Sequence, residues 1–123
     1  MIIKSIKSFK YAFRGILLVF KNENNAKIHL LATILAIAGG AYFQLAKTDW
    51  LWISLAIALV WIMETINSAI EKLVDLTSPD FNPKAGAIKD MAAGAVLFAA
   101  FFAVIVGLLV FWPYLKDVYM GEL

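Results

Sequence analysis

The sequence contains no cysteine and only one histidine, His29. The first absence excludes disulfides and cysteine metal clusters, and the second excludes a metal site built from several histidines. Charged residues are only 16% of the chain and form no long basic run, so we expect no nucleic-acid partner. Neither a Walker A sequence nor the Gly-rich loop of protein kinases is present, so any nucleotide site must be built differently.

Apolar residues, in contrast, are abundant. They make up 63% of the 123 residues, and the mean hydropathy is +0.81. Ordinary soluble domains are nearer half apolar, and a core this small could not bury so many large side chains. We therefore expect residues 1–123 to form a single domain whose natural solvent is the membrane.

Three segments are long enough to cross a bilayer, at about residues 28–46, 50–70 and 91–115. The second is uncharged from Trp50 to Met63 and must continue past Glu64 to reach full length. Backbone groups in lipid must be paired internally, so all three segments are predicted to be helices. The expected fold class is an all-α membrane protein.

Residues 1–27 are predicted to form an amphipathic surface helix and a cytoplasmic link. The apolar residues recur at spacings of three and four, which is helical periodicity, and cations interrupt them. Because charge is mixed through the whole segment, a cleavable signal peptide fits poorly. The stripe consists of Ile2, Ile6, Phe9, Phe13, Ile16 and Phe20.

Lysine and arginine counts predict the orientation. Segment 1–27 holds six of these residues, the loop 71–90 holds three, and the segments 47–49 and 116–123 hold one each. The positive-inside rule places the N-terminus and the loop 71–90 in the cytoplasm and the C-terminus outside.

The second span ends in a row of polar residues. Glu64, Asn67, Glu71 and Asp75 fall within roughly an 80° sector of one helical face, because successive residues are about 100° apart. Ionisable residues inside spans are costly and usually functional. Glu71 and Asp75 alone could equally be a solvated helix end, but Glu64 lies too deep for that interpretation to be favoured.

Further polar residues are expected at the same cytoplasmic level. Two carboxylates, Glu23 and Glu71, can share a hard cation such as Mg²⁺ and leave room for phosphates. Lys89 can contact a phosphate, although an interface anchor is the commoner role for such a lysine. With Asp90 and the deep Glu64, this set suits phosphoryl transfer to a membrane lipid alcohol, in which a carboxylate removes the hydroxyl proton.

The residues carrying this pattern resemble the small prokaryotic diacylglycerol kinase and undecaprenol kinase family. Residues 64–76, "ETINSAIEKLVDL", match the signature E-x-x-N-[ST]-[AS]-[IL]-E-x-x-[VI]-D. The blocks "KYAFRGI", "NENNAKIH" and "AGAIKDMAAGAVL" resemble the family's other blocks in the same order. The resemblance implies a homotrimeric lipid kinase of the bacterial inner membrane that uses MgATP.

The resemblance also implies roles for individual residues. Glu64 would be the catalytic base and Asn67 would support its geometry, while Glu23 and Glu71 would hold Mg²⁺. Glu64 and Ala93 would lie against the lipid, although some relatives have serine at the latter position. The family often has arginine where Lys4 stands and histidine where Asn82 stands. The residues implied on the nucleotide side, besides Glu23 and Glu71, are Lys4, Tyr11, Asp75, Asp80, Phe81, Asn82, Lys89 and Asp90.

The lipid and the function class leave alternatives open. "ENNAKIH" and "VDLTSPDFNP" resemble the undecaprenol branch more than the diacylglycerol branch, but both acceptors are primary hydroxyls on long apolar tails. A proton-coupled transporter subunit would explain Glu64 but not the other polar residues gathered at one surface. A non-catalytic assembly factor would use the polar stripe only to hold helices together.

Overall fold

The computed structural model of the protein describes residues 1–121, which form four α-helices and no strand. The helices are α1 (Ile2–Asn22), α2 (Asn24–Phe43), α3 (Lys47–Thr77) and α4 (Pro83–Tyr119). Three of them, α2, α3 and α4, are long and apolar enough to cross a membrane. The predicted fold class, an all-α membrane protein with three spans behind an N-terminal helix, is confirmed.

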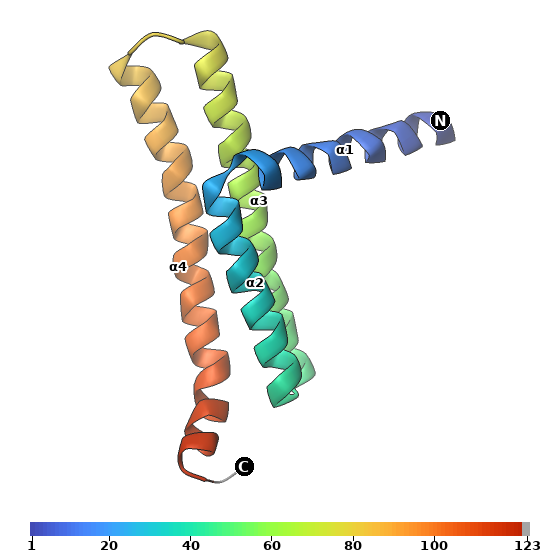
Figure 1. The fold of residues 1–123 in the computed structure, drawn as a ribbon, viewed down its shortest axis with the longest axis vertical. Coiled ribbons are helices and arrows are strands. Elements are labelled where there is room, and N and C mark those ends of the chain that lie inside the picture. The colour runs from blue at the N-terminus through green and yellow to red at the C-terminus, as the bar shows by residue number, and fades with distance from the viewer. Residues whose placement is uncertain (122–123) are drawn as a thin grey trace.

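Helices α3 and α4 form a long antiparallel hairpin that extends past the end of α2 (Figure 1). They contain 31 and 37 residues, so at 1.5 Å per residue they are roughly 46 and 55 Å long. A hydrocarbon core is only about 30 Å thick. The ends of α3 and α4 therefore project beyond the bilayer and can carry charges into water.

The expected loop 71–90 is wrong in extent, because only residues 78–82 lie outside the two helices. Charge does not end a helix once it leaves lipid, since each added residue still gains a backbone hydrogen bond. The helix breaks where the chain reads Ser-Pro-Asp-Phe-Asn-Pro. Pro83 occupies the first turn of α4, and the side chain of Asn82 accepts a hydrogen bond from the Lys84 N–H at 2.9 Å.

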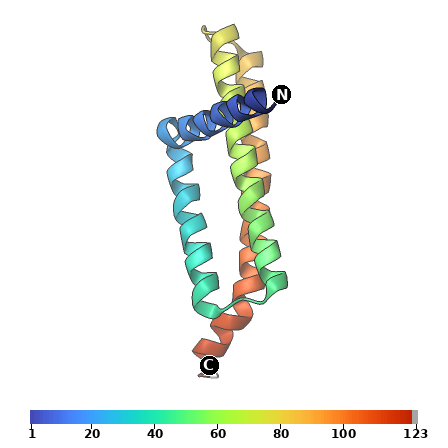
Figure 2. The same ribbon diagram turned by 90° about the vertical axis from the view of Figure 1, so that its right-hand side faces the viewer.

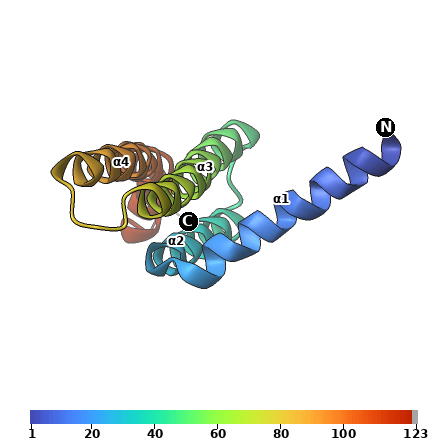
Figure 3. The same ribbon diagram turned by 90° about the horizontal axis from the view of Figure 1, so that it is seen from above.

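Helix α1 lies across the top of α2 and extends away from the other helices (Figures 1 and 3). The junction is Glu23, whose extended backbone (φ −107°, ψ 122°) ends α1 and begins α2. Of the predicted apolar stripe, Ile2, Phe9 and Phe13 remain exposed, whereas Phe20 at the inner end stacks on Trp61 with ring centroids 4.7 Å apart. An uncovered stripe of this kind is what a helix lying in a membrane surface requires.

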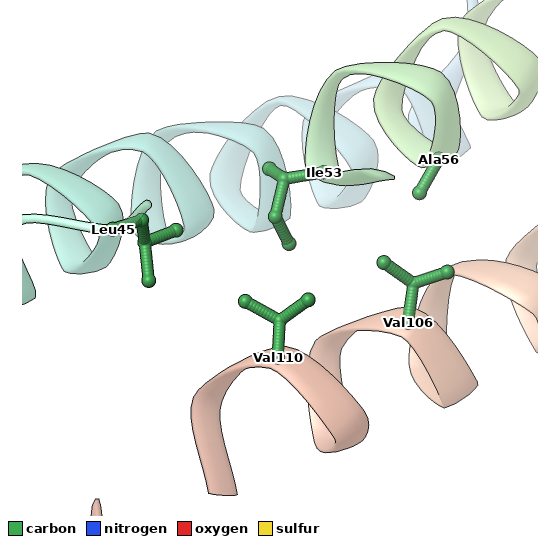
Figure 4. Packing of buried hydrophobic residues seen from close by; sticks show 5 residues of the cluster. All are labelled: Leu45, Ile53, Ala56, Val106 and Val110. Carbon is green, nitrogen blue, oxygen red and sulfur yellow. The ribbon is translucent and has the colours of Figure 1, made fainter. Parts of the chain in front are cut away.

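A buried apolar cluster joins α3 to α4 near the end opposite the hairpin turn (Figure 4). It consists of Leu45, Ile53, Ala56, Val106 and Val110, with Leu45 contributed by the α2–α3 connection. Helix α3 packs much more extensively against α4 than against α2. Because lipid tails are as apolar as these side chains, close packing rather than exclusion from water stabilises the contact.

The turn between α2 and α3 depends on one left-handed residue, Gln44 (φ 54°), after which the Leu45 N–H bonds back to Gly40 O at 3.1 Å. Gly40 also admits a neighbouring ring. A Cβ at Gly40 would lie 2.5 Å from the Trp50 side chain. The sequence-based prediction that the Gly39–Gly40 pair serves close packing fits this contact and the one between Gly39 and Phe111.

Candidate active site

Among residues 1–121, the most completely buried polar residue is Glu64, in the middle of α3. It is the largest fully buried side chain, with 0% exposure. His29, in the second turn of α2, brings Nε2 to 3.2 Å from Glu64 Oε2, although without the geometry of a hydrogen bond. A buried carboxylate is costly unless a partner compensates it. His29 is the partner that the fold provides.

The His29 ring is held by contacts between α2 and α3. The Trp61 ring meets it edge-on, with centroids 6.2 Å apart. Trp61 Nε1 donates to Thr33 Oγ1 at 2.9 Å, and Thr33 Oγ1 donates to His29 O at 2.7 Å. These bonds fix the register of the two helices at the level where the imidazole meets the carboxylate.

One turn further along α3, Asn67 and Ser68 are also buried, with 5% and 3% exposure. Asn67 Nδ2 donates to Glu71 Oε1 at 3.2 Å. Four buried side-chain oxygens in residues 1–121 have no hydrogen-bond partner, namely both oxygens of Glu64, Asn67 Oδ1 and Ser68 Oγ. Buried polar atoms are rarely left unpaired in folded proteins, so this concentration marks α3 at residues 64–68 as a functional region.

The two predicted magnesium ligands, Glu23 and Glu71, lie near the next turn of α3. Glu23 Oε1 lies 3.9 Å from the Nζ of Lys72, the residue that follows Glu71, so the corner between α1 and α2 faces this turn of α3. Residues 1–121 contain no group of three carboxylate, histidine or cysteine side chains able to hold a metal. Mg²⁺ commonly takes only one or two carboxylates and completes its shell with water and phosphates. The oxygen donors of Glu23, Glu71 and the unpaired Asn67 amide fit that chemistry.

The projecting ends of α3 and α4 enclose a hollow of about 450 Å³. Six predicted nucleotide-side residues line it: Asp75, Asp80, Phe81, Asn82, Lys89 and Asp90. Inside this outer hollow, Lys89 Nζ donates to Asp75 Oδ1 at 2.5 Å. The side chain of Asp75 is 65% exposed, in contrast to the fully buried Glu64. The polar stripe of α3 thus runs from a buried end to a solvated end.

Three predicted site residues lie away from these levels of α3. Lys4 and Tyr11 are exposed on α1, whose first half points away from the hairpin (Figure 3). Ala93 is exposed on α4 and does not line the outer hollow. It is also absent from an apolar groove of about 350 Å³ that α2, α3 and α4 form beside His29.

Sequence reasoning missed His29, Ser68 and the Trp61–Thr33 bond. A signal for His29 was present, because a titratable residue stands just inside the start of a predicted span. Its partner could not be found that way, since the His29–Glu64 contact joins residues 35 positions apart and depends on helix rotation. Ser68 belongs to the signature, but an uncharged serine in a predicted span gives no signal of a functional role.

The fold and this site define a small integral-membrane protein with a carboxylate-rich site at one end of its spans. The model of the family described as prokaryotic diacylglycerol kinase matches residues 10–111. The chain belongs to this family, which confirms the predicted family and the prediction of an enzyme, a lipid kinase.

Curated relatives cover most of the chain. An undecaprenol kinase of Bacillus subtilis (strain 168) is 39% identical over 107 residues, which is 87% of each chain. A diacylglycerol kinase of Synechocystis sp. is 39% identical over 101 residues, 81% of this chain but only 58% of the relative. A diacylglycerol kinase of Escherichia coli (strain K12) is 29% identical over 109 residues, 89% of each chain.

Proposed function

We propose that this protein uses MgATP to phosphorylate a lipid alcohol in the bacterial cytoplasmic membrane. The observation that carries the proposal is the polar stripe of α3, which connects a buried carboxylate, Glu64, to a solvated hollow containing Lys89. A lipid hydroxyl and a nucleotide have opposite solubilities. A kinase joining them needs such a gradient from hydrocarbon to water.

Each level of the stripe has a role in this scheme. The outer hollow receives the nucleotide, with the Lys89 ammonium against the phosphates in place of Asp75. Glu23 and Glu71 would hold Mg²⁺, which neutralises the charge that develops on the transferred phosphoryl group. Asn67 holds Glu71 in place. Glu64 receives the proton of the lipid hydroxyl, which allows the oxygen to attack the γ-phosphorus.

Undecaprenol is the acceptor that we favour. The relative named undecaprenol kinase and one named diacylglycerol kinase are equally identical to this chain, so identity alone does not choose between them. The segments "ENNAKIH" and "VDLTSPDFNP" favour the undecaprenol branch.

We further propose a homotrimer with a cytoplasmic N-terminus. Helix α2 makes few contacts with its own subunit, and α1 leaves Lys4 and Tyr11 remote from the outer hollow. A neighbouring subunit can supply residues that one subunit lacks. The six cations of segment 1–27 support the orientation.

A kinase assay tests the function. Purified protein in mixed micelles receives Mg²⁺, radiolabelled ATP and either undecaprenol or diacylglycerol. Labelled lipid phosphate is expected with both, and faster turnover with undecaprenol. Absence of labelled lipid with any alcohol, ceramides and other prenols included, would refute the proposal.

The alternative of a proton-coupled transporter subunit rests on Glu64 alone. It predicts pH-driven, ATP-independent efflux from vesicles. We expect none, because that function leaves the outer hollow and its Asp75–Lys89 pair without a role.

A further inference from the structure

Residues 1–121 contain two lysine–carboxylate ion pairs, and each brings an ammonium to a carboxylate of the candidate site. Lys89 meets Asp75 in the outer hollow. The second pair lies at the corner between α1 and α2, where Lys72 Nζ is 3.9 Å from Glu23 Oε1. The proposed function assigns Mg²⁺ to Glu23 but no role to Lys72.

Lys72 stands at a variable position of the signature that residues 64–76 match. In that signature Glu71 is followed by two positions at which any residue is allowed, and Lys72 is the first of them. The family resemblance therefore implies nothing about this lysine, and its surroundings determine what it can do.

The two partners of the pair differ in burial. The side chain of Glu23 is only 18% exposed, whereas that of Lys72 is 53% exposed. A mostly enclosed carboxylate needs a positive partner. A half-exposed ammonium on a flexible four-carbon stem keeps much of its hydration and can change its position. Glu23 is thus the fixed member of the pair, and Lys72 is the mobile one.

Lys72 also lies between the corner and the outer hollow. The corner is at the level where α3 and α4 begin to project beyond α2 (Figure 2). Asp75, which lines the outer hollow, follows Lys72 by three residues, and residues at that spacing are neighbours on a helix surface. An ammonium that leaves Glu23 can therefore turn toward the hollow that is proposed to receive the nucleotide.

The contact between Lys72 and Glu23 is weak enough to be exchanged. A separation of 3.9 Å is too long for a hydrogen bond. Ion pairs that water reaches typically change an equilibrium constant by a factor of about five at most. Glu71 differs, since its Oε1 accepts a hydrogen bond from Asn67 Nδ2 and so has a neutral partner.

We propose that Lys72 holds Glu23 until Mg²⁺ arrives with the nucleotide, and that its ammonium then moves from the carboxylate to the triphosphate. This inference rests on the proposed kinase function and deepens it, because it adds a phosphate-binding residue to the site. It also gives the weak ion pair a purpose, which is to occupy a metal ligand without binding it tightly.

Charge counting shows what a lysine contributes here. Glu23 and Glu71 carry two negative charges, which attract a bare divalent cation but repel MgATP, because that complex is itself doubly negative. Lys72 cancels one of the two charges. It therefore weakens the binding of a bare cation and strengthens the binding of the cation–nucleotide complex. The site then selects metal that is bound to nucleotide over metal alone.

Lys72→Gln tests this selection, because glutamine keeps a polar side chain without the charge. Two affinities are measured in micelles without lipid substrate: that for Mn²⁺ alone, as a stand-in for Mg²⁺, by electron paramagnetic resonance, and that for MgATP by calorimetry. We expect Mn²⁺ to bind about two- to fivefold more tightly. MgATP should bind about tenfold more weakly, as for loss of a charge-assisted hydrogen bond. Lys72→Arg keeps the charge and should restore both affinities.

Lys21→Gln is the matched control. Lys21 lies in the last turn of α1, two residues before Glu23, and is exposed without an ion pair among residues 1–121. The variant removes the same charge from the same corner, so both affinities should stay near the wild-type values. If it shifted them as far as Lys72→Gln does, only the total charge of the corner would matter, and the inference would be overturned.

The outcomes separate this inference from the proposed function. If the wild type phosphorylates no lipid alcohol, the proposed function is wrong, whereas opposite shifts of the two affinities in Lys72→Gln still support the exchange at Glu23. If the wild type is active and Lys72→Gln binds both ligands as the wild type does, only the role of Lys72 is wrong. A fall in both affinities together with a lower unfolding midpoint would mean that the pair only holds the corner in place, which also overturns the inference.

Discussion

The two halves of α3, a packed end around Ile53 and Ala56 and a polar end that begins at Glu64 near the middle of the helix, are built on opposite principles. Around Ile53 and Ala56 the helix packs against α4 in a cluster of small and branched apolar side chains. Around Glu64 and Ser68 it buries polar atoms, four of which have no hydrogen-bond partner in residues 1–121. One helix thus contains a well-packed end and an end whose polar groups remain unsatisfied.

This difference separates stability from function. Unpaired buried polar groups cost about 1–3 kcal/mol each, so a helix selected only for stability would replace them. Their presence is explained if ligands complete their bonding. The apolar end, whose contacts are complete, then holds the hairpin in the geometry that the polar end needs. Substitutions at the two ends should accordingly change different measured quantities.

Glu64→Gln should have the largest effect on catalysis. We expect kcat to fall about 10³-fold, because an amide cannot share the proton of the lipid hydroxyl. The unfolding midpoint should stay level or rise, since a neutral amide is cheaper to bury than a carboxylate. Steady-state kinetics and thermal unfolding followed by circular dichroism measure the two effects. A large loss of stability, or wild-type turnover, would break the contrast between the two ends.

Lys89→Ala should have the next largest effect, on nucleotide binding. A charge-assisted hydrogen bond contributes about 1.5–3 kcal/mol, so the KM for MgATP should rise about tenfold or more while kcat changes little. Lys84→Ala is the control: it removes the same charge from the first turn of the same helix, and Lys84 does not line the outer hollow. Equal effects of the two variants would mean that Lys89 acts only through long-range charge.

Gly40→Ala probes the packed end. The new Cβ would lie 2.5 Å from Trp50, whose rigid ring must shift, and such overpacking costs about 1–3 kcal/mol. The kcat at low temperature should remain near the wild-type value. Gly94→Ala is the matched control, because nothing lies within 4 Å of its added Cβ, and alanine favours helix by up to about 1 kcal/mol. Unfolding in micelles measures both. A stable Gly40→Ala variant would contradict the close α2–α3 contact.

Sequence alone predicted the three spans well, because bilayer thickness imposes an apolar length that composition reveals. It placed Glu64, Asn67, Glu71 and Asp75 on one face through helical periodicity, and Asn67 and Glu71 do bond to each other. It took residues 71–90 as the connection between two spans, although the same periodicity carried the helix to Asp75, and only residues 78–82 lie outside the helices. A helix that leaves lipid loses its apolar signal without losing its hydrogen bonds, so hydropathy cannot locate its end.

Contacts between helices were beyond prediction from the residues themselves. His29 meets Glu64, and Trp61 meets Thr33, only because α2 and α3 pack with one particular rotation. Periodicity shows which face of a helix is polar but not which neighbour covers it. The roles of the outer residues came from resemblance, and they remain predictions until nucleotide binding is measured.

Asp75→Asn should have the smallest effect, and it sharpens the contrast within the polar stripe. The Asp75–Lys89 pair is more than a third exposed on both sides, and exposed ion pairs typically stabilise by about 0.2–1 kcal/mol. The variant should therefore lower the free energy of unfolding by less than about 1 kcal/mol, and the difference should shrink in 0.5 M salt because salt screens exposed charges. Denaturant titration of both proteins at low and high salt measures this. A loss above about 2 kcal/mol would mean that the outer hollow is a structural element like the apolar cluster, and that function is confined to the levels of Glu64 and Glu71.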